Sequence, residues 1–396
     1  MKKIYIISII ILLSFYSCKE NNKIVSVVKS INFKTDIVNV YWRYKGLYFD
    51  KNLQQEIVYF SDFGQSFIKT YNLQGGLIDS IPLENVLNKF VGQISFIYPY
   101  SKDTIFCGKE NKILVINHYG DIYHTVNLDS ILPDPEKYLY NLIGRSIPYQ
   151  ENSSNKILFH PFLKEYEFLS KKNKLDLDLK SGREFFLKAF HNSPYFLEIK
   201  NIFSNKIEYN FEIHNFYKDF FTEKDAMMYS ESNFKGINDF IFLISISKNK
   251  ILKIDANNFD ILKEIDVKSK YTDMGASITI EDDLNNTENY KKNALYAGYI
   301  SELFYNEKIK QYMVIVMHTV KDKEEYDKYN GFDYRPFSII IYDENFENPK
   351  EYVFEANIYI CRNSFMSEEG LWIQRKPENL TKENYGIQTF DLLKFN

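Results

Sequence analysis

Cys18 is the residue whose surroundings define its chemistry most clearly. It follows an apolar run over residues 4–16, and two lysines precede that run. This layout is typical of a bacterial secretory signal. The run is about a dozen residues long, too short for the ~20 residues that a membrane-spanning helix needs. The small Ser17 suits cleavage before Cys18, which predicts lipidation of Cys18 as the new N-terminal residue. The alternatives are an uncleaved anchor, or cleavage at another bond with Cys18 incidental.

Two arginines in expected loops give a second chemical hint. The chain has 49 lysines and arginines, of which only six are arginine. Arginine is favoured over lysine where a planar, bidentate donor is needed. Arg145 and Arg335 each lie beside a proline and aromatic residues, and loops on a rigid scaffold often carry binding residues. We expect the pair to bind an anion or a carboxylate. The alternative is that each pairs with an acid or a backbone carbonyl and stabilises the fold.

Other catalytic and metal-binding patterns are absent or weak. The sequence has no hydrolase elbow, no phosphate-binding loop, no Cys-x-x-Cys pair, and no histidines at metal-ligand spacing. The segment 255–260 has oxygen-bearing residues at alternate positions, as calcium loops do. It lacks the glycine and the distal glutamate of such loops and coincides with an expected hairpin turn, so a turn is favoured. No metal and no cofactor is predicted.

Charge and cysteine content narrow the class of protein. The net charge is −4, and it becomes −6 when residues 1–17, with two lysines and no acids, are removed. A net negative charge of this kind does not indicate the basic surface that nucleic-acid binding requires. Cys107 and Cys361 are the two cysteines besides Cys18. They could form one disulfide or remain as two buried free thiols, and the second is favoured because sequence cannot establish their proximity.

A repeat defines the elements that must position any site. Segments 68–83 and 113–128 align without a gap, 45 residues apart, and each is a strand, a turn with Asn and Gly, and a second strand. Glycine tolerates the positive φ of tight hairpin turns, and Asn caps such turns. Further copies occupy 251–267 and 337–354. One or two apolar strands precede each hairpin, so the unit is about four strands per repeat.

Four strands in about 45 residues is the blade unit of a β-propeller. We therefore expect an all-β fold, a single propeller of six or seven four-stranded blades. A β-sandwich array is the competing fold, but its strands would not repeat in this order at a near-constant period. The expected division is a lipoprotein signal peptide at 1–17, a lipidated cysteine and tether at 18–30, and the propeller at 31–396.

The closing segments 369–373 and 385–393, with the signal and the repeat, resemble a family of Bacteroidota lipoproteins known as domain of unknown function 4221. That family is similar to the six-bladed propeller lipoproteins of the same bacteria. The resemblance implies export, lipidation and a propeller. It implies no activity, since the family has no established catalytic residues.

These observations predict a lipid-anchored propeller of the cell envelope that acts as a binding or interaction module. Its partners would be the membrane, through the N-terminal lipid, and an unidentified protein or extracellular ligand, but not nucleic acid. One acid in the segment 19–23 favours the outer membrane. The alternative functions are a glycan-active enzyme, a lyase or glycosidase with its site in the central channel, and a structural or sensory component of the envelope.

Overall fold

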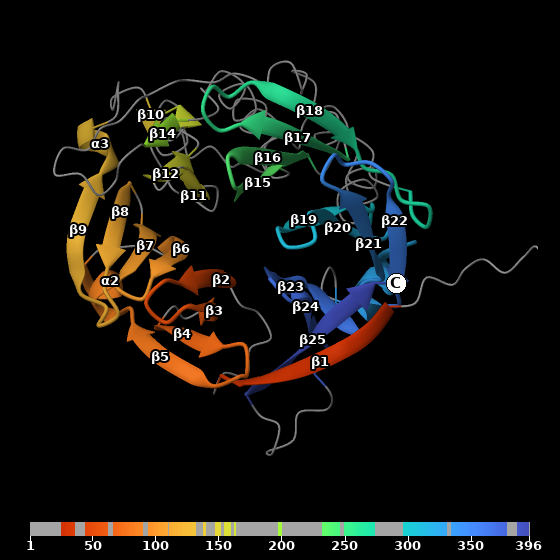
Figure 1. Ribbon diagram of the computed structural model, residues 1–396, viewed down its shortest axis with the longest axis horizontal. Helices are drawn as coiled ribbons and strands as arrows, with labels where there is room; N and C mark the ends of the chain where they lie inside the picture. Colours follow the sequence, from red (N-terminus) through yellow and green to blue (C-terminus); the bar gives the residue numbers. More distant parts are fainter. Residues whose placement is uncertain are drawn as a thin grey trace, which may run out of the picture.

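The protein is a ring of antiparallel β-sheets around a central axis (Figure 1). The computed structural model describes residues 25–35, 44–61, 66–89, 94–109, 111–131, 138–139, 147–151, 154–159, 162–163, 197–199, 232–245, 249–273, 296–330, 334–377 and 386–395. The all-β propeller expected from the repeat is confirmed. In these ranges no helix is long and apolar enough to cross a membrane.

Five sheets have four strands each, and in four of them the strands follow chain order from the axis outwards (Figure 1). The first blade contains β2 (Tyr44–Asp50), β3 (Gln55–Ser61), β4 (Phe67–Asn72) and β5 (Leu77–Pro82). The second contains β6 (Ile94–Ser101), β7 (Thr104–Lys109), β8 (Lys112–Ile116) and β9 (Ile122–Asn127). A later blade contains β15 (Ser232–Ile237), β16 (Phe240–Ser245), β17 (Lys250–Asp255) and β18 (Ile261–Asp266). The blade after it contains β19 (Tyr299–Asn306), β20 (Gln311–Met317), β21 (Phe337–Asp343) and β22 (Lys350–Phe354).

The fifth four-stranded sheet is the closing blade, which joins the two ends of the described chain. It contains β23 (Tyr359–Ser367), β24 (Gly370–Arg375), β25 (Ile387–Phe395) and, at its outer edge, β1 (Val25–Lys34). Strand β1 begins at Val25, within the segment 18–30 that the sequence analysis assigns to the lipidated cysteine and tether. The hydrophobic alternation that marks other strands is weak in β1, because its first half is largely exposed.

The expectation of six or seven four-stranded blades is corrected to five within the described residues. A three-stranded sheet of β11 (Ile147–Glu151), β12 (Ser154–Phe159) and β14 (Leu197–Ile199) lies between the β6–β9 and β15–β18 blades (Figure 1). A pair of short strands, β10 (Tyr138–Leu139) and β13 (Phe162–Leu163), lies nearby. Dividing the chain by 45 residues assumed that every period yields a complete blade, and the described residues between 132 and 231 do not form one.

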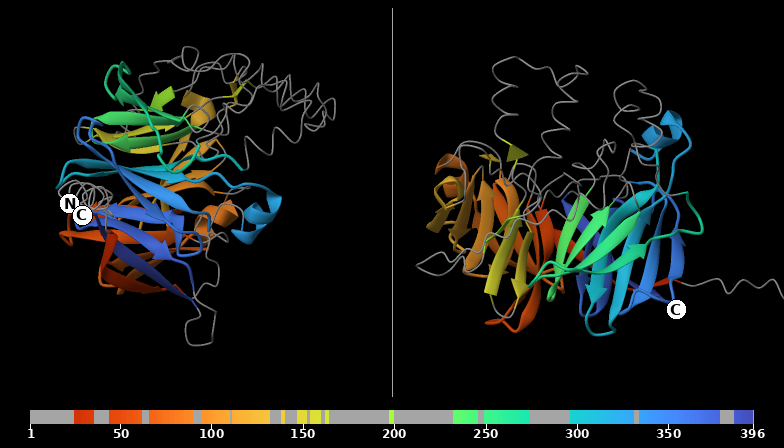
Figure 2. Two further views of the ribbon diagram at one scale, coloured as in Figure 1. Left: turned by 90° about the vertical axis from the view of Figure 1, so that its right-hand side faces the viewer. Right: turned by 90° about the horizontal axis from the view of Figure 1, so that it is seen from above.

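Short helices occur in three connections of the described chain: α2 (Glu84–Lys89), α3 (Leu128–Ile131) and α9 (Lys323–Lys328). Helix α9 lies in the charged insertion between β20 and β21, and it projects from one face of the ring (Figure 2). Its N-cap is Asp322, whose side chain accepts a hydrogen bond from the backbone N–H of Glu325.

The repeated hairpins are the third and fourth strands of their blades, as the alignment predicts. In the first two copies one asparagine caps the turn: Asn72 Oδ1 accepts from the N–H of Gly76, and Asn117 Oδ1 accepts from the N–H of Asp121. The turn glycines Gly75 and Gly120 have φ of 86° and 77°. A Cβ on Gly120 would lie 2.0 Å from a backbone oxygen in the preceding blade, so a glycine is required for both reasons.

The third hairpin places the calcium-like segment in such a turn. Asp255 Oδ1 accepts from the N–H of Asn257 at 2.7 Å, and Asn258 Oδ1 accepts from the N–H of Asp260 at 3.0 Å. These bonds within the turn fit the hairpin interpretation. The side chains that resembled calcium ligands cap the backbone here.

Buried apolar side chains fill the spaces between neighbouring blades. Between the closing blade and the β2–β5 blade, the Phe33 ring lies 5.3 Å from that of Phe60 and 5.5 Å from that of Phe390, between ring centroids. Cys107 and Cys361 are buried in different blades and form no disulfide, which confirms the alternative of two buried thiols. Burial raises the pKa of Cys107 to about 12.

A buried carboxylate joins all four strands of the closing blade. Asp391 on β25, 1% exposed, accepts from Ser30 Oγ of β1 at 2.7 Å and from Tyr359 Oη of β23 at 3.1 Å. Arg375 of β24 donates Nε to Asp391 Oδ2 at 3.0 Å and Nη2 to Oδ1 at 2.8 Å. Since β1 and β25 come from opposite ends of the chain, this network helps to hold the ring closed.

We predict that Asp391→Ala lowers the free energy of unfolding by about 2 kcal/mol, because it removes a buried charged acceptor and leaves the buried Tyr359 hydroxyl without it. Denaturant titration of the two proteins measures the loss. Glu369→Gln is the matched control, since it breaks the exposed Lys29–Glu369 pair at 3.4 Å, which also links β1 to the closing blade. This control should cost less than about 1 kcal/mol. Equal losses in the two variants would contradict a special role for Asp391.

Candidate functional site

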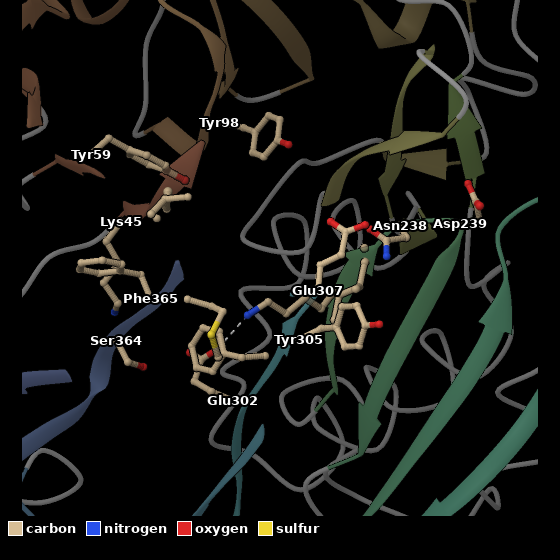
Figure 3. A pocket seen from close by; sticks show the side chains of 17 residues that line it. Lys45, Tyr59, Tyr98, Asn238, Asp239, Glu302, Tyr305, Glu307, Ser364 and Phe365 are labelled. Atoms are coloured by element: carbon tan, nitrogen blue, oxygen red, sulfur yellow. Dashed lines mark ion pairs between the residues drawn. The ribbon is translucent and has the colours of Figure 1, made fainter. Parts of the chain in front are cut away.

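A pocket of about 710 Å³ lies in the central channel, where the first strands of the blades face one another (Figure 3). Side chains of β2, β6, β15, β19 and β23 line it, together with Tyr59 of β3. Strands β2 and β15 stand on opposite sides of the axis (Figure 1). The volume falls within the ~300–1,000 Å³ typical of small-molecule sites.

Lys235 and Glu302 form an ion pair inside this pocket. Lys235 Nζ on β15 lies 3.8 Å from Glu302 Oε2 on β19, and 3.9 Å from the centroid of the Phe304 ring. Charge-assisted N–H···O bonds are about 2.7–2.9 Å long, so this pair is an ion pair without a direct hydrogen bond. Burial lowers the pKa of Lys235, and the charge of Glu302 opposes that shift.

Lys45 enters the pocket from β2 and begins a buried polar chain. Its Nζ donates to Asn363 Oδ1 at 3.0 Å, and Asn363 Nδ2 donates to Gln374 Oε1 at 2.6 Å. Gln374 Nε2 donates in turn to Gln388 Oε1. The chain therefore runs from β2 through β23 and β24 to β25. Burial lowers the pKa of Lys45 to about 8, and the charge of Glu302 opposes that shift.

Arg362 on β23 adds a third cation near the two lysines. Its Nη2 donates to Tyr299 Oη, and its guanidinium carbon lies 5.9 Å from the centroid of the Tyr299 ring. Burial raises the pKa of Tyr299, against the charge of Arg362. The positive charge of Arg362 also contributes to the lowered pKa of Lys45. The charged residues that line the pocket are two lysines, Lys45 and Lys235, and three acids, Asp239, Glu302 and Glu307.

Backbone irregularities shape the pocket wall. The first strands β6, β19 and β23 each contain a register shift, and the shift in β19 lies between Ile300 and Glu302. Such bulges change the direction in which a strand presents its side chains. On β2, a Cβ added to Gly46 would lie 2.8 Å from the Tyr59 ring. Glycine at this position therefore lets the Tyr59 ring pack against β2.

The structure places one of the three predicted site residues. Arg335 is 1% exposed and is not among the residues that line the pocket. Its Nη2 donates to the carbonyl oxygens of Tyr296 at 2.9 Å and Ala297 at 3.0 Å, and also to that of His318. This placement favours the structural alternative for Arg335. Cys18 and Arg145 lie outside the described residues, so lipidation at Cys18 and an anion site shared by the two arginines stay predictions.

A histidine and a serine that could form a nucleophilic pair lie close to Arg335. His318 Nε2 is 2.7 Å from Ser338 Oγ, a spacing that suits activation of a serine. Ser338 is fully buried and His318 is 7% exposed, so a substrate has no access to the hydroxyl. Burial lowers the pKa of His318, and Glu351 opposes that shift. We interpret this pair as part of the blade's internal hydrogen bonding.

The pocket residues carry no motif that sequence reasoning could have used. Lys45, Lys235 and Glu302 are ordinary charged residues on the first strands of three different blades. Their common feature is a position on the strand next to the axis. Only a complete assignment of strand order and register would have placed them around one pocket.

Comparisons with known proteins agree with the fold. No protein-family model matches the chain, and no curated protein does either. A member of the DUF4221 family from Bacteroides vulgatus is similar in structure, with a TM-score of 0.64, 14% identity, and coverage of 96% of this chain and 99% of that one. A candidate exported protein from Bacteroides fragilis has a TM-score of 0.49 at 12% identity, covering 94% and 96% of the two chains. The sequence resemblance to the DUF4221 family is thus matched by a shared propeller fold.

Arg335 provides a direct test of a structural role. We predict that Arg335→Met lowers the free energy of unfolding by about 3 kcal/mol, because three backbone carbonyls lose a buried charged donor. Thermal and denaturant unfolding measure the loss against Lys350→Met, a change on the exposed side of β22. Unchanged stability in Arg335→Met would contradict the structural assignment and restore Arg335 as a ligand-binding candidate.

Lys45 should make the stability of the folded protein change with pH in the alkaline range. Its folded pKa of about 8 is below the ordinary 10.5, so between these values the unfolded chain binds more protons than the folded one. Stability conferred at this site therefore rises with pH across that window. The measured quantity is the melting temperature of the wild type minus that of Lys45→Met. We predict that this difference increases by about 2 °C between pH 7.5 and pH 10, which corresponds to roughly 1 kcal/mol in the free energy of unfolding after solvent screening. A difference that is constant with pH would show that Lys45 titrates normally.

Proposed function

We propose that this protein is a lipid-anchored binding module of the cell envelope that takes a small ligand in its central channel. The observation that carries the proposal is the pocket of about 710 Å³. It is lined by the first strands of five blades, and it presents charged and aromatic side chains that originate far apart in the sequence. A rigid ring that brings such groups together is suited to recognition.

Anchoring and location rest on the N-terminal segment. An apolar run after two lysines, followed by a small residue and Cys18, supports export and lipidation. The one acid in the segment 19–23, Glu20, supports the outer membrane as the location. Several acyl chains on one cysteine would hold the protein firmly at a bilayer, whereas one chain alone binds marginally.

Lipidation is tested by expressing the full chain and Cys18→Ser in a bacterial host. We expect wild-type protein in the detergent-soluble membrane fraction, with a mass that corresponds to loss of residues 1–17 and addition of acyl groups. Cys18→Ser should lack the acyl mass. Acyl-free wild-type protein, or cleavage at another bond, would contradict the lipoprotein assignment.

Ligand binding is tested by a thermal-shift screen of the full chain against glycans, peptides, divalent cations and small anions. A ligand at 100 times its Kd stabilises the native state by about 2.7 kcal/mol. A hit in the channel should weaken in Lys45→Met and persist in Lys350→Met. No shift across the panel would contradict small-ligand binding and favour a protein partner. Consumption of the hit would identify the alternative, a glycan-active enzyme.

A further inference from the structure

We infer that one face of the ring lies against a phospholipid bilayer, with the side chains of Leu53 and Ile309 at the lipid surface. This face, here called the turn face, is defined by the hairpin turns 51–54, 307–310 and 368–369. The inference rests on the anchoring part of the proposed function, since it names the surface that a lipidated Cys18 would bring to the membrane.

Strand direction places the start of β1 on the turn face. Strand β23 ends at the turn 368–369, from which β24 returns. Strand β25 is antiparallel to β24 and therefore runs in the same direction as β23, so it also ends on the turn face. Val25 of β1 pairs with Phe395 at that end of β25. The chain that leads from Cys18 into the ring therefore enters it at the turn face.

The hairpin turns of the two neighbouring blades lie beside this entry point. The backbone N–H of Glu368, in the turn of the closing blade, donates to Oε1 of Glu56 near the start of β3 at 2.9 Å. Asn306, at the end of β19, donates its Nδ2 to the carbonyl oxygen of Ser367 at 3.1 Å. The β2–β3 and β19–β20 turns therefore flank the β23–β24 turn on one face of the ring.

The chain between Cys18 and Val25 is short compared with the ring. The two residues are seven positions apart, which spans at most about 25 Å. The nine residues of β25 alone rise by about 27 Å. Helix α9 and the end of β25 lie on opposite sides of the ring (Figure 2). A bilayer at the turn face is within reach of Cys18, whereas one beyond α9 would need the whole segment merely to cross the ring.

The turn face carries exposed apolar side chains next to lysines. Leu53 is 46% exposed and Ile309 is 52% exposed, each within its turn. Lys51 precedes Leu53 by two positions, and Lys308 and Lys310 flank Ile309. Lysines can extend their ammonium groups to phospholipid headgroups while neighbouring apolar side chains enter the interface. This arrangement fits a lipid surface.

The charges of the turn face balance. Its three lysines stand against three glutamates, Glu307, Glu368 and Glu369. The turns 102–103 and 238–239, which join the first two strands of their own blades, add one lysine and two aspartates farther from the closing blade. Attraction to anionic lipid requires clustered basic residues. A zwitterionic phospholipid is therefore the partner that fits, held by apolar contact and by the anchor.

This orientation also directs one end of the central-channel pocket towards the membrane. Glu307 belongs to the turn face and lines the pocket, as do Asn238 and Asp239 in the corresponding turn of the β15–β18 blade. A molecule that is itself held in the bilayer would have access to this end of the pocket.

Fluorescence energy transfer tests the orientation on the full acylated chain in phosphatidylcholine vesicles that contain an acceptor-labelled lipid headgroup. A donor maleimide is attached at Asn52→Cys on the turn face or at Glu324→Cys on α9. Cys107 and Cys361 are buried, so wild-type protein should take up little dye. We expect transfer at least about twofold stronger from Asn52→Cys, because the length of the blade strands separates the two sites.

A double variant tests the apolar contact. Leu53→Asp with Ile309→Asp should weaken transfer from the dye at Asn52→Cys by about twofold or more, because charged side chains oppose entry into the interface. Leu262→Asp with Val353→Asp is the matched control, since it changes two exposed apolar residues on the outer strands β18 and β22. This control should leave the transfer unchanged.

The outcomes separate the orientation from the proposed function. Equal transfer from the two labels, or stronger transfer from Glu324→Cys, would overturn the orientation. Unchanged transfer in the Leu53 and Ile309 double variant would overturn the apolar contact. In both cases the proposed anchoring stands if the mass of the protein shows acyl groups on Cys18. Protein without acyl groups would overturn the anchoring and the orientation together.

Discussion

Antiparallel pairing of β1 with β25 closes the ring, and the other blades depend on it for their arrangement around the axis. The ladder runs from Val25 opposite Phe395 to Lys34 opposite Ile387. This pairing covers the edge of β25, which would otherwise be open to other chains, and makes β1 the outer edge of the closing blade. The apolar layer between the closing blade and the β2–β5 blade is complete only when β1 supplies Phe33. Backbone hydrogen bonds, buried aromatic rings and the Asp391 network therefore all stabilise the junction where β1 joins the closing blade.

The pocket depends on the same closure. Lys45 of β2 donates to Asn363 of β23, and these residues are 318 positions apart in the sequence. Asn363 is tied through Gln374 to Gln388 of β25, the strand that pairs with β1. The position of the Lys45 ammonium group is thus coupled to the strands that join the two ends of the chain. Stability of the ring and geometry of the site are parts of one polar network.

Periodic features of this fold could be predicted from the sequence, and long-range ones could not. The hairpins were predictable because an asparagine cap and a glycine with positive φ are local requirements, as at Asn72 and Gly75. Strand β1 was missed because its pairing partner is far away and its exposed first half lacks alternation. The pocket residues were missed for a related reason. Lys45 and Glu302 become neighbours through blade order and a bulge in β19, and neither leaves a local pattern.

The position of β1 also has a consequence for folding during synthesis. Its partner β25 is the last strand in the described part of the chain. Until β25 has emerged from the ribosome, the N–H and C=O groups of β1 that pair with it have no partner strand. In the described part of the chain, the first strand in sequence is therefore the one whose partner is made last.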